Sequence, residues 1–150
     1  MPQSLTQNLL HLIYSTKERR PQLTPDFRDS MHAMSASVLQ RLESPAICIG
    51  GVEDHVHILF SLSKKKSLVD VVRDVKANTS KWANEQGFAD SQFQWQSGYG
   101  AFSVSQSNVI RVKEYIQAQD EHHKEWSFQD EFRAILKKHK IEYDERYVWD

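Results

Sequence analysis

Cysteine is nearly absent from this sequence of 150 residues, since Cys48 is the only one. A single thiol excludes a disulfide framework and a zinc site built from several cysteines. Long apolar runs are missing as well, and no stretch approaches the roughly 20 residues that a membrane-spanning helix needs. The first residues lack the basic and apolar regions of a secretion signal. We therefore expect a cytoplasmic protein without a membrane span.

An excess of basic residues is missing too, because 19 Lys and Arg stand against 20 Asp and Glu, for a formal net charge of −1. A global positive field, which often accompanies nucleic-acid binding, is therefore absent, and any such binding has to use a local patch. The sequence also lacks internal repeats, which argues against a solenoid. Its 39% hydrophobic and 26% charged residues are typical of a globular chain. The length predicts a single domain over residues 1–150.

Hydrophobic periodicity predicts strands and helices along the whole chain. Strands are predicted over residues 5–15, 46–49, 55–62 and 99–104, and helices over 26–42, 67–87, 105–123 and 127–139. Ser67 with Asp70 resembles a capping box at one helix start, and Gly87 suits the end of that helix. The first six elements follow the split β-α-β order. We predict an α+β fold of the ferredoxin-like type, an antiparallel sheet with helices on one face plus C-terminal helices. Many unrelated proteins share this architecture, so it indicates no function.

A pair of histidines, His55 and His57, is the sharpest local feature of the sequence. Residues two apart on a strand point to the same side of a sheet, so both imidazoles share one face while Val56 and Ile58 enter the core. Two imidazoles on one face can bind a divalent cation, but a further ligand has to come from elsewhere. Such a pair also occurs by chance and can simply belong to a polar sheet face.

Tyr115 and Gln119 lie four positions apart on a predicted helix, which puts them on one side of it together with Arg111. A helical tyrosine often packs its ring and leaves its hydroxyl in water. It can also act as a nucleophile on a phosphodiester, provided that a cation neutralises the charge of the phosphate. Two imidazoles and a Gln carbonyl would hold such a cation and leave positions open for substrate.

Four stretches together are far more specific than the histidine pair alone. They are LHLIYSTK (residues 10–17), DHVHIL (54–59), GYGAFSV (98–104) and YIQAQ (115–119). In these stretches and their order, the sequence resembles the single-tyrosine HUH transposases, the small enzymes of the IS-two-hundred type and their stand-alone REP-associated relatives. The resemblance covers essentially the whole chain.

This resemblance implies that His55 and His57 hold a divalent metal, Mg²⁺ or Mn²⁺, with Gln119 as the third ligand. Tyr115 matches the nucleophile. Enzymes of this kind cut single-stranded DNA at the ends of mobile or hairpin-forming elements. They form a 5′-phosphotyrosine link and leave a free 3′-OH, which can later reverse the attack. The resemblance further implies a homodimer with sheets joined edge to edge and active sites completed in trans.

Local basic residues could follow DNA phosphates even though the total charge is nearly neutral. The candidates are Lys17, Arg19, Arg20, Lys64, Lys65, Lys66, Arg73, Lys76 and Arg111. A lysine triplet is equally typical of a solvated loop. His122, one turn beyond Gln119, could support the metal ligands, whereas His11 is interpreted as a strand or dimer-edge residue.

Two other functions fit the predicted fold. A non-catalytic single-stranded nucleic-acid-binding module of RRM-like fold would use aromatic residues on an open sheet, whereas this sheet face would present histidines. A small-molecule sensor of ferredoxin-like fold would need a closed apolar pocket, of which the sequence carries no sign. A metal-dependent transposase is therefore the leading hypothesis.

Overall fold

A four-stranded antiparallel sheet forms the centre of the computed structural model, which describes residues 2–89 and 91–150. The strands are β1 (Leu9–Ser15), β2 (Ala46–Gly51), β3 (His55–Ser61) and β4 (Gly100–Ser103). Their spatial order is β2-β3-β1-β4, which is the predicted ferredoxin-like arrangement. The register pairs Leu9 with Ser61 and Ser15 with His55. The two central strands, β1 and β3, are therefore the ones that carry His11, His55 and His57.

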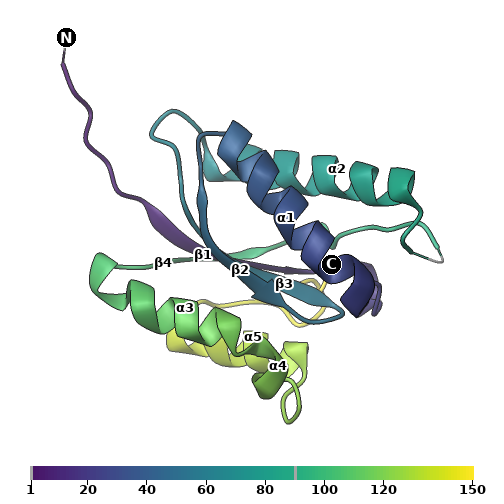
Figure 1. Cartoon of the computed structure of the whole chain (residues 1–150). Helices are drawn as coiled ribbons and strands as arrows, with labels where there is room; N and C mark the ends of the chain where they lie inside the picture. Colours follow the sequence, from purple (N-terminus) through teal and green to yellow (C-terminus); the bar gives the residue numbers. More distant parts are fainter. Residues whose placement is uncertain (1, 90) are drawn as a thin grey trace.

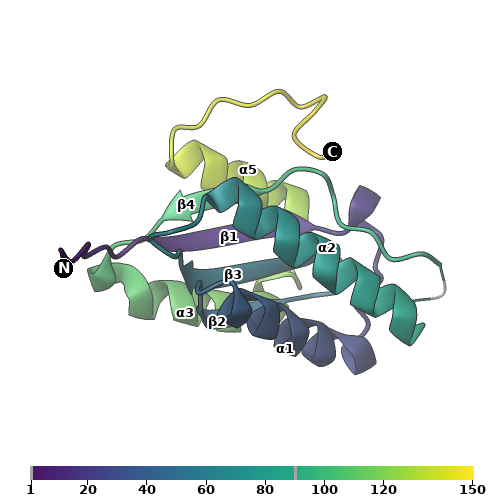
Figure 2. The same ribbon diagram turned by 90° about the horizontal axis from the view of Figure 1, so that it is seen from above.

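Two long helices, α1 (Pro25–Arg41) and α2 (Leu68–Gln86), pack side by side on one face of the sheet (Figures 1 and 2). The start of α2 is capped as predicted, because the hydroxyl of Ser67 accepts a hydrogen bond from the backbone N–H of Asp70 at 3.2 Å. Its end at Gly87 adopts the left-handed conformation with φ 69°, which favours glycine. A short 3₁₀ turn, η1 (Lys17–Arg19), follows β1.

The main hydrophobic core lies between this face of the sheet and the two helices. Alternate strand residues supply it, and these include Leu12 and Tyr14 from β1 and Val56 and Ile58 from β3. The side chains between them point to the opposite face, because successive residues of a strand alternate. The prediction that Val56 and Ile58 enter the core is confirmed, and it forces His55 and His57 onto the other side.

The opposite face of the sheet is covered by the C-terminal helices (Figure 1). They are α3 (Val109–Gln117), α4 (Gln119–His122) and α5 (Phe128–Lys138), and a short turn, η2 (Gln106–Asn108), precedes them. The predicted single helix ending near residue 123 is wrong, because the chain leaves helical geometry at Ala118 with ψ 17°. The approach of α3 to β2 is close, since a Cβ on Gly50 would lie 2.4 Å from the carbonyl oxygen of Ile116.

The chain after α5 returns over the molecule toward the segment before β4 (Figure 2). The backbone N–H of Gly98 donates a hydrogen bond to the carbonyl oxygen of Asp150 at 2.8 Å. The Trp149 ring packs against Phe128 and Phe132 of α5, with centroids 6.3 Å and 6.0 Å apart. These contacts hold the C-terminal segment against α5 and against the segment before β4. Among the described residues, no helix combines the length and the apolar character that a bilayer crossing requires.

Candidate functional site

His55 and His57 lie side by side at the start of β3, beneath the C-terminal helices. Both side chains are completely buried. Their ring centroids are 5.1 Å apart, and both rings point away from the core under α1 and α2. The sequence pattern predicted this shared face, and the helices that cover it turn the two imidazoles into the floor of an enclosed polar site.

A second partner orients each of the two imidazoles. The Nδ1 atom of His55 lies 2.7 Å from Oδ1 of Asp54, and Nδ1 of His57 lies 2.8 Å from Nε2 of His11. Partners of this kind fix the ring and the tautomer of metal-binding histidines, so that Nε2 faces the ion. The prediction that His11 lies on a strand is confirmed, but it is not an edge residue, because β1 is a central strand and the His11 imidazole supports His57.

Gln119 and His123 approach the same point from α4 and the residue that follows it. The Oε1 atom of Gln119 lies 3.1 Å from Nε2 of His55 and 3.0 Å from Nε2 of His123. His122 instead places its ring 4.7 Å from the ring of Tyr115. The histidine that joins the cluster is therefore His123 and not His122. The signal in the sequence that could have identified His123 was the spacing of four residues from Tyr115 to Gln119 and again from Gln119 to His123.

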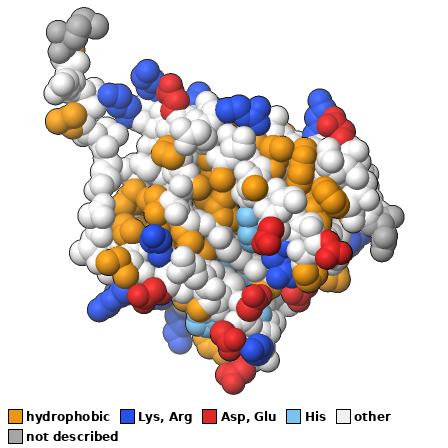
Figure 3. Space-filling model, viewed as in Figure 1, with side chains coloured by type: hydrophobic (Ala, Val, Ile, Leu, Met, Phe, Trp, Pro, Cys, Tyr) orange, Lys and Arg blue, Asp and Glu red, His pale blue; other side chains and the backbone are white. Residues whose placement is uncertain are grey.

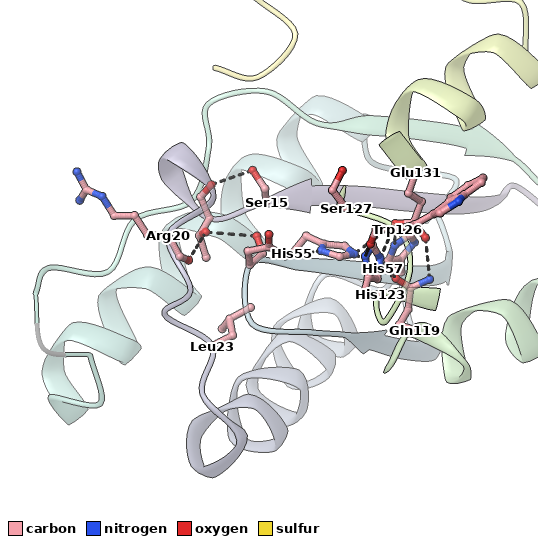
Figure 4. A network of polar contacts seen from close by, with 12 residues as sticks. Ser15, Arg20, Leu23, His55, His57, Gln119, His123, Trp126, Ser127 and Glu131 are labelled. Atoms are coloured by element: carbon pink, nitrogen blue, oxygen red, sulfur yellow. Dashed lines mark hydrogen bonds and ion pairs between the residues drawn. The ribbon is translucent and has the colours of Figure 1, made fainter. Parts of the chain in front are cut away.

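Glu131 of α5 provides a buried carboxylate at the centre of the cluster (Figure 4). Its Oε1 atom lies 3.3 Å from Nε2 of His55, 3.1 Å from that of His57 and 3.1 Å from that of His123. Sequence analysis missed this residue. The signal that could have identified it was a single acidic residue, three positions after Phe128, on an otherwise apolar helix face. A carboxylate buried on such a face is stable only with hydrogen-bonding partners.

Tyr115 reaches the cluster from α3 within the same chain. Its hydroxyl donates a hydrogen bond to Oε2 of Glu131, and the side-chain amide of Gln119 donates to the same oxygen at 3.1 Å. The tyrosine ring lies 5.7 Å from the ring of His57. The carboxylate of Glu131 therefore joins the phenol on one side to the imidazoles on the other.

The electrostatics of the site follow from burial and from these contacts. Burial alone would lower the pKa of His55, but its hydrogen bonds to Asp54 and Glu131 raise that pKa to about 9. Burial lowers the pKa of His57 to about 4. Burial would raise the pKa of Glu131, yet hydrogen bonds from the surrounding histidines hold it well below its usual range. Burial and the nearby Glu131 raise the pKa of Tyr115.

These groups fit a divalent cation. Ligand atoms of His55, His57 and Glu131 all lie within 4.8 Å of one another, and all three side chains are buried. Imidazole and carboxylate are suitable ligands for first-row divalent metals, and the Gln119 oxygen adjoins them. The carboxylate of Asp54 on Nδ1 of His55 is the outer hydrogen bond that a metal-binding histidine usually makes, and the imidazole of His11 takes the same position on His57.

The sequence matches the family described as "Transposase IS200 like" over residues 4–119. The chain belongs to this family of transposases. The match includes β1, β3 and α3 and ends at Gln119, so Glu131 and His123 lie beyond it. A comparison with curated proteins finds no match.

Two solved structures are similar to this transposase in fold. One is a protein from Deinococcus radiodurans R1 assigned to the transposases, with 18% identity and a TM-score of 0.62, over 79% of this chain and 98% of that one. The other is the REP-associated tyrosine transposase bound to a REP hairpin, with 13% identity and a TM-score of 0.60. That match covers 82% of this chain and 73% of the other. At these identities, the likeness concerns the fold.

The basic residues of the transposase that were predicted to bind DNA do not form one surface. Lys17, Arg73 and Lys76 line a cavity beside α2, whereas Arg111 lines a different cavity beside Tyr115. Lys64, Lys65 and Lys66 are exposed in the loop at the opposite end of β3 from His55, Arg19 lies over the Trp149 ring, and Arg20 pairs with Glu18. Acidic and basic side chains are interspersed on the face in Figure 3. Their role in DNA binding stays a prediction.

Proposed function

We propose that this transposase cleaves and rejoins single-stranded DNA at hairpin-containing element ends through a 5′-phosphotyrosine intermediate on Tyr115. One observation carries the proposal: the Tyr115 hydroxyl donates to a carboxylate, Glu131, that also contacts His55 and His57. A nucleophile, a proton acceptor and a metal-ligand set thus meet in one buried site. The similar fold of a REP-associated tyrosine transposase bound to a REP hairpin supports a hairpin-bearing substrate.

A divalent metal, Mg²⁺ or Mn²⁺, would be held by His55, His57 and Glu131, with Gln119 and His123 beside it. When bound, such an ion acts as a Lewis acid that neutralises charge on the attacked phosphate. The role of the protein is to keep both imidazoles oriented, through Asp54 and His11.

The chemistry of the protein groups follows from the two oxygens of Glu131. Oε1 faces the imidazoles, while Oε2 accepts the hydrogen bond of Tyr115. As the tyrosine oxygen attacks phosphorus, its proton passes to Oε2 of Glu131 and on to water, because the surrounding histidines hold the pKa of Glu131 too low for the carboxylate to keep the proton. The bond from phosphorus to the 3′ oxygen breaks, and that oxygen leaves as a hydroxyl after taking up a proton from water. The elevated pKa of Tyr115 makes a local proton acceptor necessary.

The alternative of a non-catalytic, RRM-like module has less support. Such a module stacks bases on the open face of its sheet. Here α1 and α2 cover one face, and the C-terminal helices cover the other (Figure 1). The second face carries the buried His11, His55 and His57 together with apolar residues such as Ile13 and Phe102. An enzymatic site beneath the helices therefore fits the molecule better than a base-stacking surface.

The homodimer with active sites completed in trans, which the resemblance implies, stays a prediction. The contacts of Tyr115 with Glu131 and Gln119 of its own chain favour a site assembled within one chain.

The proposal predicts a covalent protein–DNA product. The protein is incubated with labelled, hairpin-bearing single-stranded DNA and Mg²⁺ or Mn²⁺, and products are separated under denaturing conditions. We expect a shifted band that disappears in Tyr115→Phe, because the phenol oxygen forms the bond. Tyr147→Phe, which alters an exposed tyrosine in the C-terminal segment, is the matched control and keeps the band. A Tyr115→Phe protein that still forms the adduct contradicts the assignment.

A further inference from the structure

A cavity of about 530 Å³ lies next to the histidine cluster, between β4, α3 and α5. Its inner end is formed by Tyr115, Glu131 and His11. Of these, Glu131 and His11 are almost inaccessible to solvent. Its outer end is formed by exposed residues, which include Arg111 and Lys138. The cavity is therefore a path from solvent to the tyrosine hydroxyl.

The walls of this cavity are largely apolar. The apolar lining residues include the buried Phe102 of β4, Val112 of α3 and Ile135 of α5. Trp126 lies at the side of the cavity with 51% of its surface exposed, beside Glu131 in Figure 4. An exposed tryptophan at the side of an apolar cavity offers a flat surface on which a planar ring can stack.

The rim of the cavity is cationic. Arg111 of α3 and Lys138 of α5 both line it, and both are exposed. Neither forms an ion pair with another residue in the described part of the chain, whereas Arg73 and Arg133 are paired with acids. Free cations around an apolar cavity match the chemistry of a nucleotide, which has a planar base and an anionic phosphate.

We propose that this cavity binds one unpaired nucleotide of the DNA strand, the nucleotide next to the phosphate that Tyr115 attacks. The base enters the cavity and stacks on Trp126, while the flanking phosphates lie at Arg111 and Lys138. The volume suits such a ligand, since small-molecule sites span about 300–1,000 Å³. Because Tyr115 and Glu131 form the inner wall, a nucleotide held there has its phosphate beside the nucleophile. This inference rests on the proposed function, since it assumes a single-stranded DNA substrate.

The test measures binding alone, with EDTA present so that no cleavage occurs. The probe is a DNA hairpin with single-stranded flanks that carry 2-aminopurine at one position at a time. We expect fluorescence quenching on binding at one flank position, because that base stacks in the cavity. Trp126→Ala should weaken binding about tenfold and remove the quenching. Arg111→Ala and Lys138→Ala should each reduce the slope of log affinity against log salt by about 0.7.

Matched controls come from the same helices. Lys113→Ala and Lys137→Ala remove cations of α3 and α5 that do not line the cavity, and they should leave the quenching intact. The inference is overturned if Arg111→Ala and Lys138→Ala leave the affinity and the salt slope unchanged, or if quenching is equal at every flank position. Neither result affects adduct formation by Tyr115. Complete lack of DNA binding overturns it as well. If the expected quenching occurs but no covalent adduct forms, the cavity stands and the proposed cleavage function fails.

Discussion

Glu131 connects the parts of the site at the scale of single residues, although it lies 74 positions from His57 in the sequence. A buried carboxylate is stable only with hydrogen-bonding partners, and here each oxygen has its own set. Oε1 faces imidazoles, and Oε2 accepts from Tyr115 and Gln119. The metal-ligand set and the nucleophile therefore depend on one side chain.

Glu131→Gln tests this dependence because it keeps the shape and removes the charge. We expect Mn²⁺ affinity, measured by calorimetry, to fall about tenfold or more, since an anionic ligand is lost. Adduct formation should fall by about 10²–10⁴, which is the usual effect of losing a proton acceptor. Glu121→Gln, on an exposed side chain of α4, serves as the control. Unaltered Mn²⁺ affinity in Glu131→Gln would show that the carboxylate is not a ligand.

His55 gives the metal-free protein a defined dependence of stability on pH. Burial opposes the charged ring, but Asp54 and Glu131 raise its pKa from 6.5 to about 9. The stability from this shift is fully present below pH 6.5 and is lost as the pH rises through about 9. The Asp54→Asn variant lacks one hydrogen-bonding partner of His55. Between pH 6.5 and about 9, the free energy of unfolding of this variant should therefore fall less than that of the wild type. Urea unfolding in EDTA measures both proteins, and parallel pH profiles would contradict the role of Asp54.

At the scale of elements, Lys76 ties α2 to the segment before β4. Its ammonium donates to the carbonyl oxygens of Gln96 at 2.8 Å and Gly98 at 2.6 Å, and it lies 4.9 Å from the centre of the Tyr14 ring. Burial lowers the pKa of this lysine to about 8. An ammonium whose protons are already engaged is a poor partner for phosphate, in contrast to the DNA contact predicted from the sequence.

Lys76→Met should therefore affect folding and not DNA binding. We expect the free energy of unfolding to fall by about 1.5–3 kcal/mol, the range for hydrogen bonds to a charged group. The slope of DNA affinity against salt should remain that of the wild type. Lys81→Met changes an exposed lysine of the same helix and should leave both quantities unaffected. A reduced salt slope with normal stability in Lys76→Met would restore the predicted phosphate contact.

At the scale of the whole molecule, the sheet separates two compartments. The hydrophobic core lies under α1 and α2, and the polar site lies under α3, α4 and α5 (Figure 1). A second, smaller apolar cluster, which includes Phe102, Phe128 and Phe132, fastens α5 over the site. Because one chain supplies the tyrosine, the carboxylate and the imidazoles, a single copy contains every proposed catalytic group.

Co-expression of two inactive variants tests whether that single copy suffices. One carries Tyr115→Phe and the other His57→Ala, so a mixed dimer with sites completed in trans would regain one complete site. We expect no recovery of covalent adduct, because Tyr115 contacts the cluster of its own chain. Wild-type protein co-expressed with each variant controls for inhibition of an active subunit by an inactive one. Substantial recovered activity would establish the trans arrangement that the family resemblance implies.

Local spacing in the sequence was enough for much of this description. Periodicity located the strands and most helix boundaries, since alternation in a strand and steps of three or four in a helix are backbone properties. The same reasoning put His55 and His57 on one face of a strand and brought Tyr115 and Gln119 to one side of the chain, although the two lie on separate helices, α3 and α4. It failed at Ala118, where the backbone leaves a helix that the pattern alone would continue.

The remaining members of the site were decided by tertiary structure. Glu131 joins the cluster because Phe128 and Phe132 anchor α5 over the sheet, a contact between segments far apart in the chain. His11 reaches His57 because the register sets β1 beside β3. Residue type and spacing in the sequence thus determined which groups could do chemistry. Only the packing of helices across the second sheet face determined which groups meet, because that depends on long-range contacts that no local pattern encodes.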